Sequence, residues 1–441
     1  MNPPPTRREQ RGWYFYDWAN SAFSTTVVTL FFGPYLTTLA KAAAGEDGSV
    51  SLLGLRLPAQ AVWPYLVSAS VLTQVAAFPL IGAIADYGRR KKEMLGLLAY
   101  AGAAATVLKF LLDGDRYLLG CLLFLVANFC FGASVVIYNS FLPEIAAPAQ
   151  RDAVSSNGWG LGYLGGGLLL ALNLLLYSNA ASLGISEAYA VRLSLASAGL
   201  WWALFTLIPL ATLRNRGPGK APPPGAGYLG AGLRQLGSTL RHIRAYRQAL
   251  LFLLAYLIYN DGIQTVITLA AQFGQEELGL SMGVLTSSIL LAQAVAFLGA
   301  LGFKSVAERT GARRAVMLTL IIWSLTLVYV YAGVRGEADF YTLAGVIGAV
   351  MGASQALSRS LFSFLIPRGQ EAEYYSLYEI SDKGTSWLGP LFFGLALQFT
   401  GRYRLAVLSL VVFFVAGLAL LARVDVRAGA RQAGNEPPPR P

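Results

Sequence analysis

Twelve apolar stretches recur along the chain, and each is long enough, at about 20 residues or more, to cross a bilayer as a helix. Backbone groups inside hydrocarbon must be satisfied within the protein, and a helix does this within each segment. Only 13% of the residues are charged, against about 25% in soluble domains. The sequence therefore predicts an all-α membrane protein with twelve transmembrane helices. The predicted spans are 13–39, 59–85, 92–112, 117–142, 157–178, 189–212, 248–273, 282–303, 314–334, 339–366, 375–400 and 404–424.

The distribution of Lys and Arg predicts the orientation of these spans. If the N-terminus lies in the cytoplasm, most of the 34 basic residues fall in cytoplasmic connections, as membrane proteins prefer. We therefore expect both termini in the cytoplasm, and we attribute the net charge of +11 to basic loops rather than to nucleic-acid binding. The compact loops and the abundance of Ala, Gly and Arg favour a bacterial inner membrane.

The longest connection divides the spans into two groups of six. It begins rich in Pro and Gly, as linkers are. It then carries Leu229, Leu233, Leu236, Leu240 and Ile243 at helical spacing, interspersed with and followed by Arg234, Arg241, Arg244 and Arg247. This second part is either an amphipathic helix on the inner membrane surface or a basic linker with incidental leucines. We expect a six-helix bundle at 1–212, the linker at 213–247, a second bundle at 248–424 and a disordered cytoplasmic tail at 425–441.

The two groups of spans resemble each other in the same direction. The stretch from Leu142-Pro143 to Leu164-Gly165 aligns with the stretch from Ile366-Pro367 to Leu388-Gly389 at a constant offset. A basic turn also follows the second span of each group. Two parallel repeats of six spans are the layout of a secondary transporter whose site lies between the halves.

Several motifs resemble known transporters. The turn with Gly82, Asp86, Gly88, Arg89 and Arg90 resembles the signature loop of the major facilitator superfamily. Within it, four stretches resemble the autophagy-related vacuolar amino-acid effluxers and their bacterial relatives. They are Tyr16 to Phe23, Asn139 to Glu144, Gly158 to Gly167 and Gln355 to Phe362. Two departures occur: one residue rather than two separates Asp86 from Gly88, and Glu308 stands where the second-half loop has Asp.

This resemblance, which extends over nearly the whole chain, implies the major facilitator fold and transport by alternating access. It implies that the first, fourth, seventh and tenth spans line a cavity between the halves. The implied substrate is a neutral amino acid or a similar small zwitterion, with H⁺ as the coupling ion, and we expect a monomer. The implied gating residues are Asp86, Gly88, Arg89, Arg90, Glu308 and Arg313.

The first span carries polar residues in its first turns. Asp17, Asn20, Ser21 and Ser24 share one helical face. A charge at hydrocarbon depth is costly, so this face either looks into the bundle or a wet cavity, or Asp17 lies in headgroup water beside an interfacial aromatic belt. Because Asp17 is near the cytoplasmic end, we expect it to serve gating or proton entry.

The seventh span carries a continuous polar stripe. Asn260 precedes it, and Asp261, Gln264, Thr265, Thr268 and Gln272 follow at helical spacing. Asp261 lies half-way along the span, where a carboxylate marks a functional site by default. It could carry the coupling proton or hold a substrate ammonium group, or it could be a structural residue that is hydrogen-bonded to a neighbouring span.

The tenth and eleventh spans supply further charged residues. Gln355 and Arg359 lie on one, and Glu379 and Asp382 on the other, at similar depth from their shared connection. We therefore expect Arg359 to pair with Asp382 or Glu379, and Arg359 to serve either that pairing or a substrate carboxylate. In the fourth span, Asn128 and Asn139 share a face. Lys109 is close to the outer end of the third span, from which it could extend to the interface.

The sequence argues against other kinds of chemistry. It has one His and no Cys/His cluster with metal-ligand spacing, so we expect no metal and no cofactor. Gly160 to Gly165 matches a dinucleotide-binding pattern, but it lies in an apolar span without the required strand, and its glycines favour close helix packing. We expect a transporter rather than an enzyme. The alternatives are an integral membrane enzyme or lipid-handling protein, and a non-transporting sensor.

Overall fold

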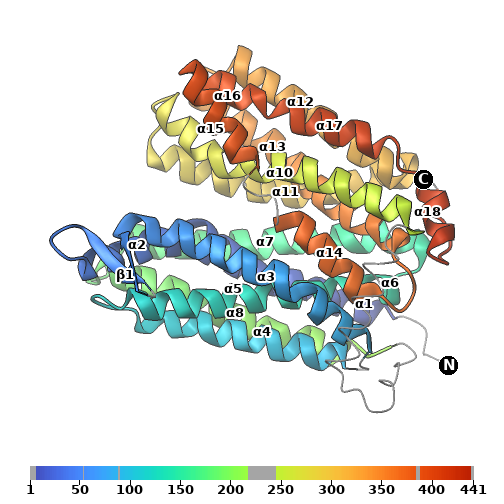
Figure 1. Cartoon of the computed structure of the whole chain (residues 1–441), viewed down its shortest axis with the longest axis horizontal. Helices are drawn as coiled ribbons and strands as arrows, with labels where there is room; N and C mark the ends of the chain where they lie inside the picture. Colours follow the sequence, from blue (N-terminus) through green and yellow to red (C-terminus); the bar gives the residue numbers. More distant parts are fainter. Residues whose placement is uncertain (1–5, 53, 88–89, 217–244, 384–387, 439–441) are drawn as a thin grey trace.

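The computed structural model describes residues 6–438 except 53, 88–89, 217–244 and 384–387. It consists of two helical bundles that lie side by side, with the N-terminal half in blue to green and the C-terminal half in yellow to red (Figure 1). Eleven helical stretches of the described chain are long and apolar enough to cross a membrane. The remaining predicted span, 375–400, is described as two helical stretches, Glu371–Lys383 and Leu388–Thr400, and residues 384–387 between them lie outside the described residues. The predicted all-α architecture with twelve spans in two repeats is therefore confirmed.

The N-terminal half begins with one long helical segment and continues through five further spans. Its elements are α1 (Arg7–Ala22), a π-helical stretch (Phe23–Phe31), α2 (Phe32–Ala43), α3 (Val62–Tyr87), α4 (Lys91–Val107) with a 3-10 turn (Leu108–Leu111), α5 (Tyr117–Ser140), α6 (Leu142–Ile145), a 3-10 turn (Pro148–Gln150), α7 (Arg151–Ser178) and α8 (Glu187–Thr212). A hairpin of β1 (Ser49–Leu52) and β2 (Leu55–Pro58), followed by a 3-10 turn (Ala59–Ala61), connects α2 to α3.

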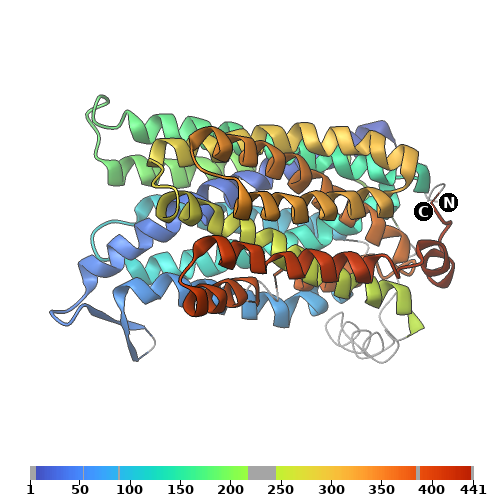
Figure 2. The same cartoon turned by 90° about the horizontal axis from the view of Figure 1, so that it is seen from above.

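The C-terminal half repeats this plan. Its elements are α10 (Arg247–Glu276), α11 (Met282–Thr310), α12 (Ala312–Ala332), α13 (Glu337–Leu365), α14 (Glu371–Lys383), α15 (Leu388–Thr400), α16 (Tyr403–Ser409), α17 (Val411–Leu421) and α18 (Val426–Gln432). Each half has its own hydrophobic core, with Trp202 buried in one and Trp323 in the other. Both chain termini lie at one end of the molecule, called the terminal end below, and the β-hairpin lies at the other (Figures 1 and 2).

The C-terminal segment differs from the expected disordered tail. Residues Val426–Gln432 form α18, and the side chain of Ala430 in this helix is fully buried. Beyond this helix, the side-chain amide of Asn435 donates hydrogen bonds to the carbonyl oxygens of Phe364 (3.0 Å) and Ile366 (2.7 Å). Carbonyl groups at a helix end have no partner within the helix. Asn435 therefore satisfies the end of α13, and this is why the segment is ordered. The leucine-rich stretch from Leu229 to Leu240 lies outside the described residues.

Glycines allow α1 and α7 to pack closely, as the spacing of Gly158, Gly162 and Gly166 predicts. A Cβ atom at Gly162 would lie 2.8 Å from Ser21 Oγ, and one at Gly166 would lie 3.1 Å from the Ser21 Cβ. Neither position can hold a larger side chain without a shift of α1. This packing fixes the polar face of α1 against α7.

Lys109 does not extend to the interface. Its side chain is fully buried, and its Nζ lies 5.5 Å from the ring centre of Phe23 and 5.3 Å from that of Phe32. The ammonium group has no hydrogen-bond partner among the described residues. The two rings offset part of the cost of burying this charge by cation–π attraction, but the hydrogen-bonding capacity of the group is left unused.

Replacement of Lys109 by Met should therefore stabilise the protein, by about 1 kcal/mol or more, because Met fills similar space without an unpartnered polar group. Thermal unfolding of the purified protein in detergent measures this as a higher midpoint. Lys41→Met is the matched control, since Lys41 is exposed on α2. A lower midpoint for Lys109→Met would mean that the ammonium group has a stabilising partner after all.

Candidate functional site

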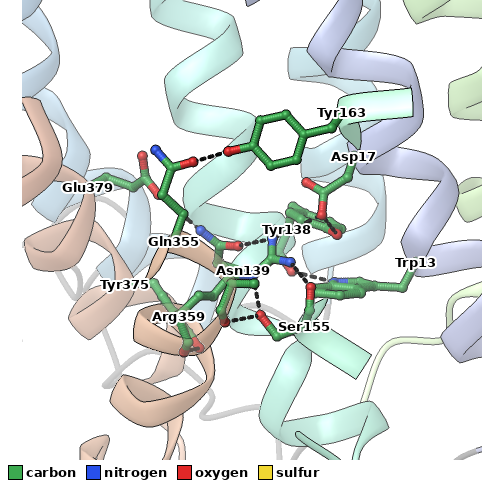
Figure 3. Close-up of polar contacts among 11 residues, drawn as sticks. Trp13, Asp17, Tyr138, Asn139, Ser155, Tyr163, Gln355, Arg359, Tyr375 and Glu379 are labelled. Atoms are coloured by element: carbon green, nitrogen blue, oxygen red, sulfur yellow. Dashed lines mark hydrogen bonds and ion pairs between the residues drawn. The ribbon is translucent and has the colours of Figure 1, made fainter. Parts of the chain in front are cut away.

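Arg359 comes from α13 in the C-terminal half, and the described hydrogen-bond partners of its guanidinium lie in the N-terminal half (Figure 3). Its Nη1 donates to Asp17 Oδ2 at 3.0 Å and to Asn139 Oδ1 at 3.4 Å. Its Nε donates to Ser155 Oγ at 2.9 Å, and its Nη2 to the Ser155 carbonyl at 2.8 Å. The guanidinium is only 2% exposed. One side chain thus crosses from one half of the molecule into the other.

Aromatic rings of the N-terminal half surround this guanidinium. Its Cζ lies 4.7 Å from the ring centre of Trp13, 5.3 Å from that of Trp159 and 5.6 Å from that of Tyr138. The rings of Trp13 and Tyr138 stack at 4.3 Å. Planar guanidinium groups stack on aromatic faces, and this attraction is strongest away from water. The rings therefore help to hold a buried cation that a purely aliphatic pocket would exclude.

Asp17 supplies the negative charge of the site. Its Oδ2 accepts hydrogen bonds from Arg359 and from the Tyr138 hydroxyl, the latter at 2.7 Å. Asp17 is buried, so the alternative that placed it in headgroup water is wrong. Gly158 on α7 makes room for the pair, because a Cβ atom there would lie 2.7 Å from Asp17 Oδ2.

The predicted pairing of Arg359 with Asp382 or Glu379 is also wrong, because the carboxylate that pairs with Arg359 is Asp17. Asp382 and Glu379 were predicted as partners because they lie at a depth similar to that of Arg359 on the next span. Depth carries no information on the direction of a side chain, and Arg359 points away from α14 into the other half. Glu379 instead accepts a hydrogen bond from the Asn139 side chain at 3.0 Å.

Further polar contacts join the two halves around Arg359. The Tyr163 hydroxyl on α7 donates to Gln355 Oε1 on α13 (Figure 3). Ser155 Oγ donates to the Ala356 carbonyl at 2.6 Å, and Arg151 Nη1 to the Ser363 carbonyl at 2.9 Å. These contacts form a row along α7 and α13 that runs from the middle of the molecule toward the terminal end.

A charged cluster joins the halves at the terminal end itself. Asp86, at the end of α3, accepts hydrogen bonds from the backbone N–H groups of Ala372 (3.0 Å) and Glu373 (2.9 Å), in the first turn of α14. Such N–H groups have no partner within their own helix, and the helix dipole favours a carboxylate beside them. Lys91 Nζ lies 3.0 Å from Asp86 and 2.9 Å from Glu144.

The close approach of α3 and α14 also needs a glycine. A Cβ atom at Gly82 would lie 2.5 Å from the Ala372 carbonyl oxygen.

The residues predicted to lie in gating loops differ in their positions. Asp86 contacts the other half, whereas Arg90 is exposed and Gly88 and Arg89 lie outside the described residues. In the second loop, Glu308 is exposed, and Arg313 donates to the carbonyl of Val424 within its own half at 2.7 Å.

The remaining predicted site residues are not among the described hydrogen-bond partners of Arg359. Asn20 is buried on α1, Gln264 is half-buried on α10, and Asn128 donates to Ser70 Oγ within the N-terminal half at 2.7 Å. In the C-terminal half, Asn260 donates to Asp382 Oδ1 at 2.8 Å, and Asp261 accepts from the Gly389 backbone at 2.7 Å. The structure thus brings one group of predicted residues together around Arg359 and another on α10, and Asn20 and Asn128 belong to neither.

Sequence reasoning missed part of the site. Ser155 contributes two oxygen atoms to Arg359, and Trp13 and Trp159 contribute rings, yet none of them stands out as a charged residue in a span would. Trp159 belongs to one of the family-like stretches, which is the signal that could have identified it. In the described part of the chain, no three His, Cys, Asp or Glu residues are grouped as a metal would require.

The comparisons with known proteins agree with this architecture. A family model described as "Vacuole effluxer Atg22 like" matches residues 5–434. The uncharacterized MFS-type transporter YxiO of Bacillus subtilis is 32% identical over 424 residues, which are 95% of this chain and 95% of that protein. Autophagy-related protein 22-1 of Aspergillus niger is 27% identical over 558 residues, covering 98% of this chain and 90% of the relative.

Solved transporters share the fold. The transporter FucP in its outward conformation superposes with a TM-score of 0.68 at 14% identity, covering 95% of this chain and 98% of that one. The proton:xylose symporter XylE gives a TM-score of 0.69 at 12% identity, covering 94% and 95%. The fold and these relatives define an integral membrane transporter of the major facilitator superfamily, not an enzyme. Within that superfamily, the chain belongs to the Atg22-like vacuole effluxer family.

The buried pair should be energetically coupled. Arg359→Met leaves Asp17 buried without its cation, which should cost about 3–5 kcal/mol, whereas the double variant with Asp17→Asn should regain part of this loss. Thermal unfolding of the single and double variants measures the coupling. Arg56→Met, which removes an exposed pair with Asp47, should change little. Additive losses in the double variant would contradict the coupling.

The contact of Asp86 with α14 should hold the terminal end closed. Asp86→Ala removes two charged hydrogen bonds, each worth about 1.5–3 kcal/mol, so the open population should rise roughly tenfold or more. A cysteine at the buried position Ser363, in a background without Cys121 and Cys130, reports this as faster labelling by a water-soluble maleimide. The control is Asp47→Ala, at the opposite end of the molecule. An unchanged labelling rate would refute the role of Asp86.

Proposed function

We propose that this transporter moves a small zwitterion, with neutral amino acids as the first candidates, by alternating access coupled to H⁺. The observation that carries the proposal is that Arg359 of one half is held by Asp17, Asn139 and Ser155 of the other. The family-model description as an effluxer favours export. The amino-acid class comes from the resemblance of the motifs described above.

The position of the contacts between the halves supports alternating access. The row along α7 and α13 and the cluster around Asp86 join the halves from the middle of the molecule to the terminal end. A path open at that end requires Arg359 to leave its partners in the N-terminal half. Because breaking a buried ion pair without replacement costs several kcal/mol, the transition needs a ligand or a proton that compensates for the lost partners.

A zwitterion has the charges that such compensation needs. Its carboxylate can take the place of Asp17 beside Arg359, and its ammonium group can then pair with the Asp17 carboxylate that is set free. One ion pair is exchanged for two, and no charge remains unpaired in the interior. This argument places the anionic partner of the substrate at Asp17 rather than at Asp261, which lies in the second group of residues.

A proton can act on the same pair. Protonation of Asp17 removes its charge, so the attraction to Arg359 is lost while the Tyr138 hydroxyl keeps a hydrogen-bond partner. The contact between the halves is then weaker, and the terminal end opens more readily. With the terminal end in the cytoplasm, as the basic loops predict, proton binding and substrate exchange would both act on the cytoplasmic gate. Each chain contains both halves, so a monomer suffices.

Transport by the purified protein in proteoliposomes tests this proposal. Efflux of a loaded neutral amino acid should depend on an imposed pH gradient, and Asp17→Asn should abolish this gradient-driven efflux, because an amide neither exchanges a proton nor pairs with the substrate ammonium group. Asp47→Asn, in the exposed hairpin loop, is the control. Gradient-driven transport that persists in Asp17→Asn would refute the role of this residue. If no amino acid raises the thermal stability of the wild-type protein, the substrate class is wrong.

A further inference from the structure

Four aromatic side chains meet on the surface of the N-terminal half, where α1 packs against α8. They are Phe15, Trp18, Trp201 and Phe205, called the ring cluster below. The rings of Trp18 and Trp201 stack with their centres 5.4 Å apart, and the Phe205 ring lies 4.7 Å from that of Trp201. Phe15 is 6.5 Å from Phe205 and 6.4 Å from Trp18. All four side chains are partly exposed, so together they form one aromatic surface.

The ring cluster lies on a face of α8 that the membrane surrounds. Leu204, between the two rings of α8, is 61% exposed, and α8 is long and apolar enough to cross a bilayer. Lipid chains are as apolar as leucine, so an exposed leucine on such a helix is stable against them. Aromatic rings are enriched where a membrane meets water. Four rings together on a lipid-facing surface therefore indicate a place close to the headgroups.

Four arginines follow the ring cluster toward the terminal end. Arg7 and Arg11 lie on the face of α1 that also carries Phe15, because the steps between them are four residues. Arg8 is beside Arg7, and Arg214 follows the last turn of α8. All four arginines are exposed.

A glycine brings the arginines of the two helices to the same place. A Cβ atom at Gly12 would lie 1.7 Å from Thr212 Oγ1, so the end of α8 reaches the first turns of α1 only because position 12 has no side chain. Arg11 is next to Gly12, and Arg214 is two residues beyond Thr212. The arginines therefore form one basic group at the end of the α1–α8 pair, and the ring cluster follows it along the same two helices.

The charge of this basic group is not balanced within the described chain. None of the four arginines forms an ion pair with a carboxylate of a described residue. Glu9, the acidic residue in the first turn of α1, already binds Arg216, whose Nη2 lies 2.7 Å from Glu9 Oε2. The N-terminal end of a helix carries partial positive charge, which repels arginines in its first turn. An external anion would offset this repulsion.

We propose that an anionic phospholipid binds along the α1–α8 surface, with its phosphate group at the basic group and its acyl chains on the ring cluster. Arginine binds phosphate through paired hydrogen bonds, and basic pockets between transmembrane helices bind anionic headgroups. The spacing also fits a lipid. At about 1.5 Å per residue, Arg11 lies about 6 Å before Phe15 along α1, and the headgroup region of one leaflet is about 5–8 Å thick.

Other occupants fit these features less well. A soluble anion would match the arginines but would leave the four rings without a role. The headgroup of a zwitterionic lipid adds a cation to a group of positive charges. A second copy of the chain, paired through the same surface, would bring two identical basic groups together, and their charges would repel each other. An anionic lipid is the occupant that suits both the charge and the rings.

The inference does not depend on the transported solute, because the α1–α8 surface shares no residue with the Arg359 site. Both helices belong to the N-terminal half, so a bound lipid would hold α1 against α8 in any arrangement of the two halves. It would stabilise the folded protein by mass action.

Thermal unfolding of the purified full-length protein in detergent tests this, with phosphatidylglycerol or phosphatidylcholine added at constant pH and ionic strength. The wild-type midpoint should rise saturably with phosphatidylglycerol and much less with phosphatidylcholine. Arg11→Gln should weaken the apparent affinity roughly fivefold, the equivalent of about 1 kcal/mol for one basic residue near an anionic surface. Arg11→Gln combined with Arg214→Gln should weaken it by roughly tenfold or more. In a second series, added salt should reduce the wild-type response, because exposed charges are screened.

Arg423→Gln combined with Arg427→Gln is the matched control for charge. Both residues are exposed at the terminal end of the other half, so the net charge changes by the same amount while the phosphatidylglycerol response should equal that of the wild type. The rings have their own pair of variants. Phe205→Leu should weaken the response, whereas Phe399→Leu should not, since Phe399 is 82% exposed on α15, outside the ring cluster.

Three results would overturn the proposal. One is equal stabilisation of the wild type by both lipids, which would mean non-specific lipid contact only. Another is an unchanged phosphatidylglycerol affinity in the variant that lacks Arg11 and Arg214. The third is a dimer that forms without lipid and is lost in Phe205→Leu, which would assign the surface to a second copy of the chain.

Native mass spectrometry decides the question if the double variant cannot be purified. The wild type should retain one phosphatidylglycerol molecule per chain, and Arg11→Gln should retain it less often under the same conditions. Equal retention by both proteins would count against the site. Amino-acid binding is measured separately, so failure of the substrate proposal would be recognised independently.

Discussion

The buried guanidinium of Arg359 is the interaction on which the arrangement of the two halves depends. A charge with this little access to water must have partners, and those of Arg359 are held by α1, α5 and α7 of the opposite bundle. Glycine at 158 provides the space, three rings provide polarizable walls, and Asp17 provides the opposite charge. Because these features serve one side chain, the two bundles are joined by a specific contact rather than by general apolar packing. Such a contact can be exchanged as a unit.

The described polar contacts between the halves lie from the middle of the molecule to the terminal end, and they must break for the halves to separate there. Asp86 binds the start of α14, and Gly82 lets the two helices meet almost backbone to backbone. Further in, the Arg359 site and the Tyr163–Gln355 contact continue the connection. A movement that separates the bundles at the terminal end must disrupt this whole series of described contacts. The proposed binding of a proton or substrate at Asp17 would act in the middle of this series.

Much of the fold follows from the sequence, because hydrocarbon demands long apolar helices and the repeat fixes their grouping. The polar face that carries Asp17 and the close packing of the small residues of α7 could also be predicted, since both follow from helical periodicity. The partner of Arg359 could not be predicted, because a sequence pattern gives the depth of a side chain but not the bundle toward which it points. Lys109 and the C-terminal segment were misjudged for a related reason. Two phenylalanine rings and two free carbonyl groups, all distant in sequence, decide their positions.

Asn435 gives the C-terminus an experimental use. Its side chain binds the end of α13, the helix that carries Arg359, so the segment after α18 would move with this helix if Arg359 left the opposite bundle as proposed. A fluorophore attached just beyond Asn435, paired with one near Thr6 before α1, would report on the ends of the two helices that contribute Arg359 and Asp17. Energy transfer between these labels would follow the separation of the halves in single molecules without a change to any residue inside the membrane.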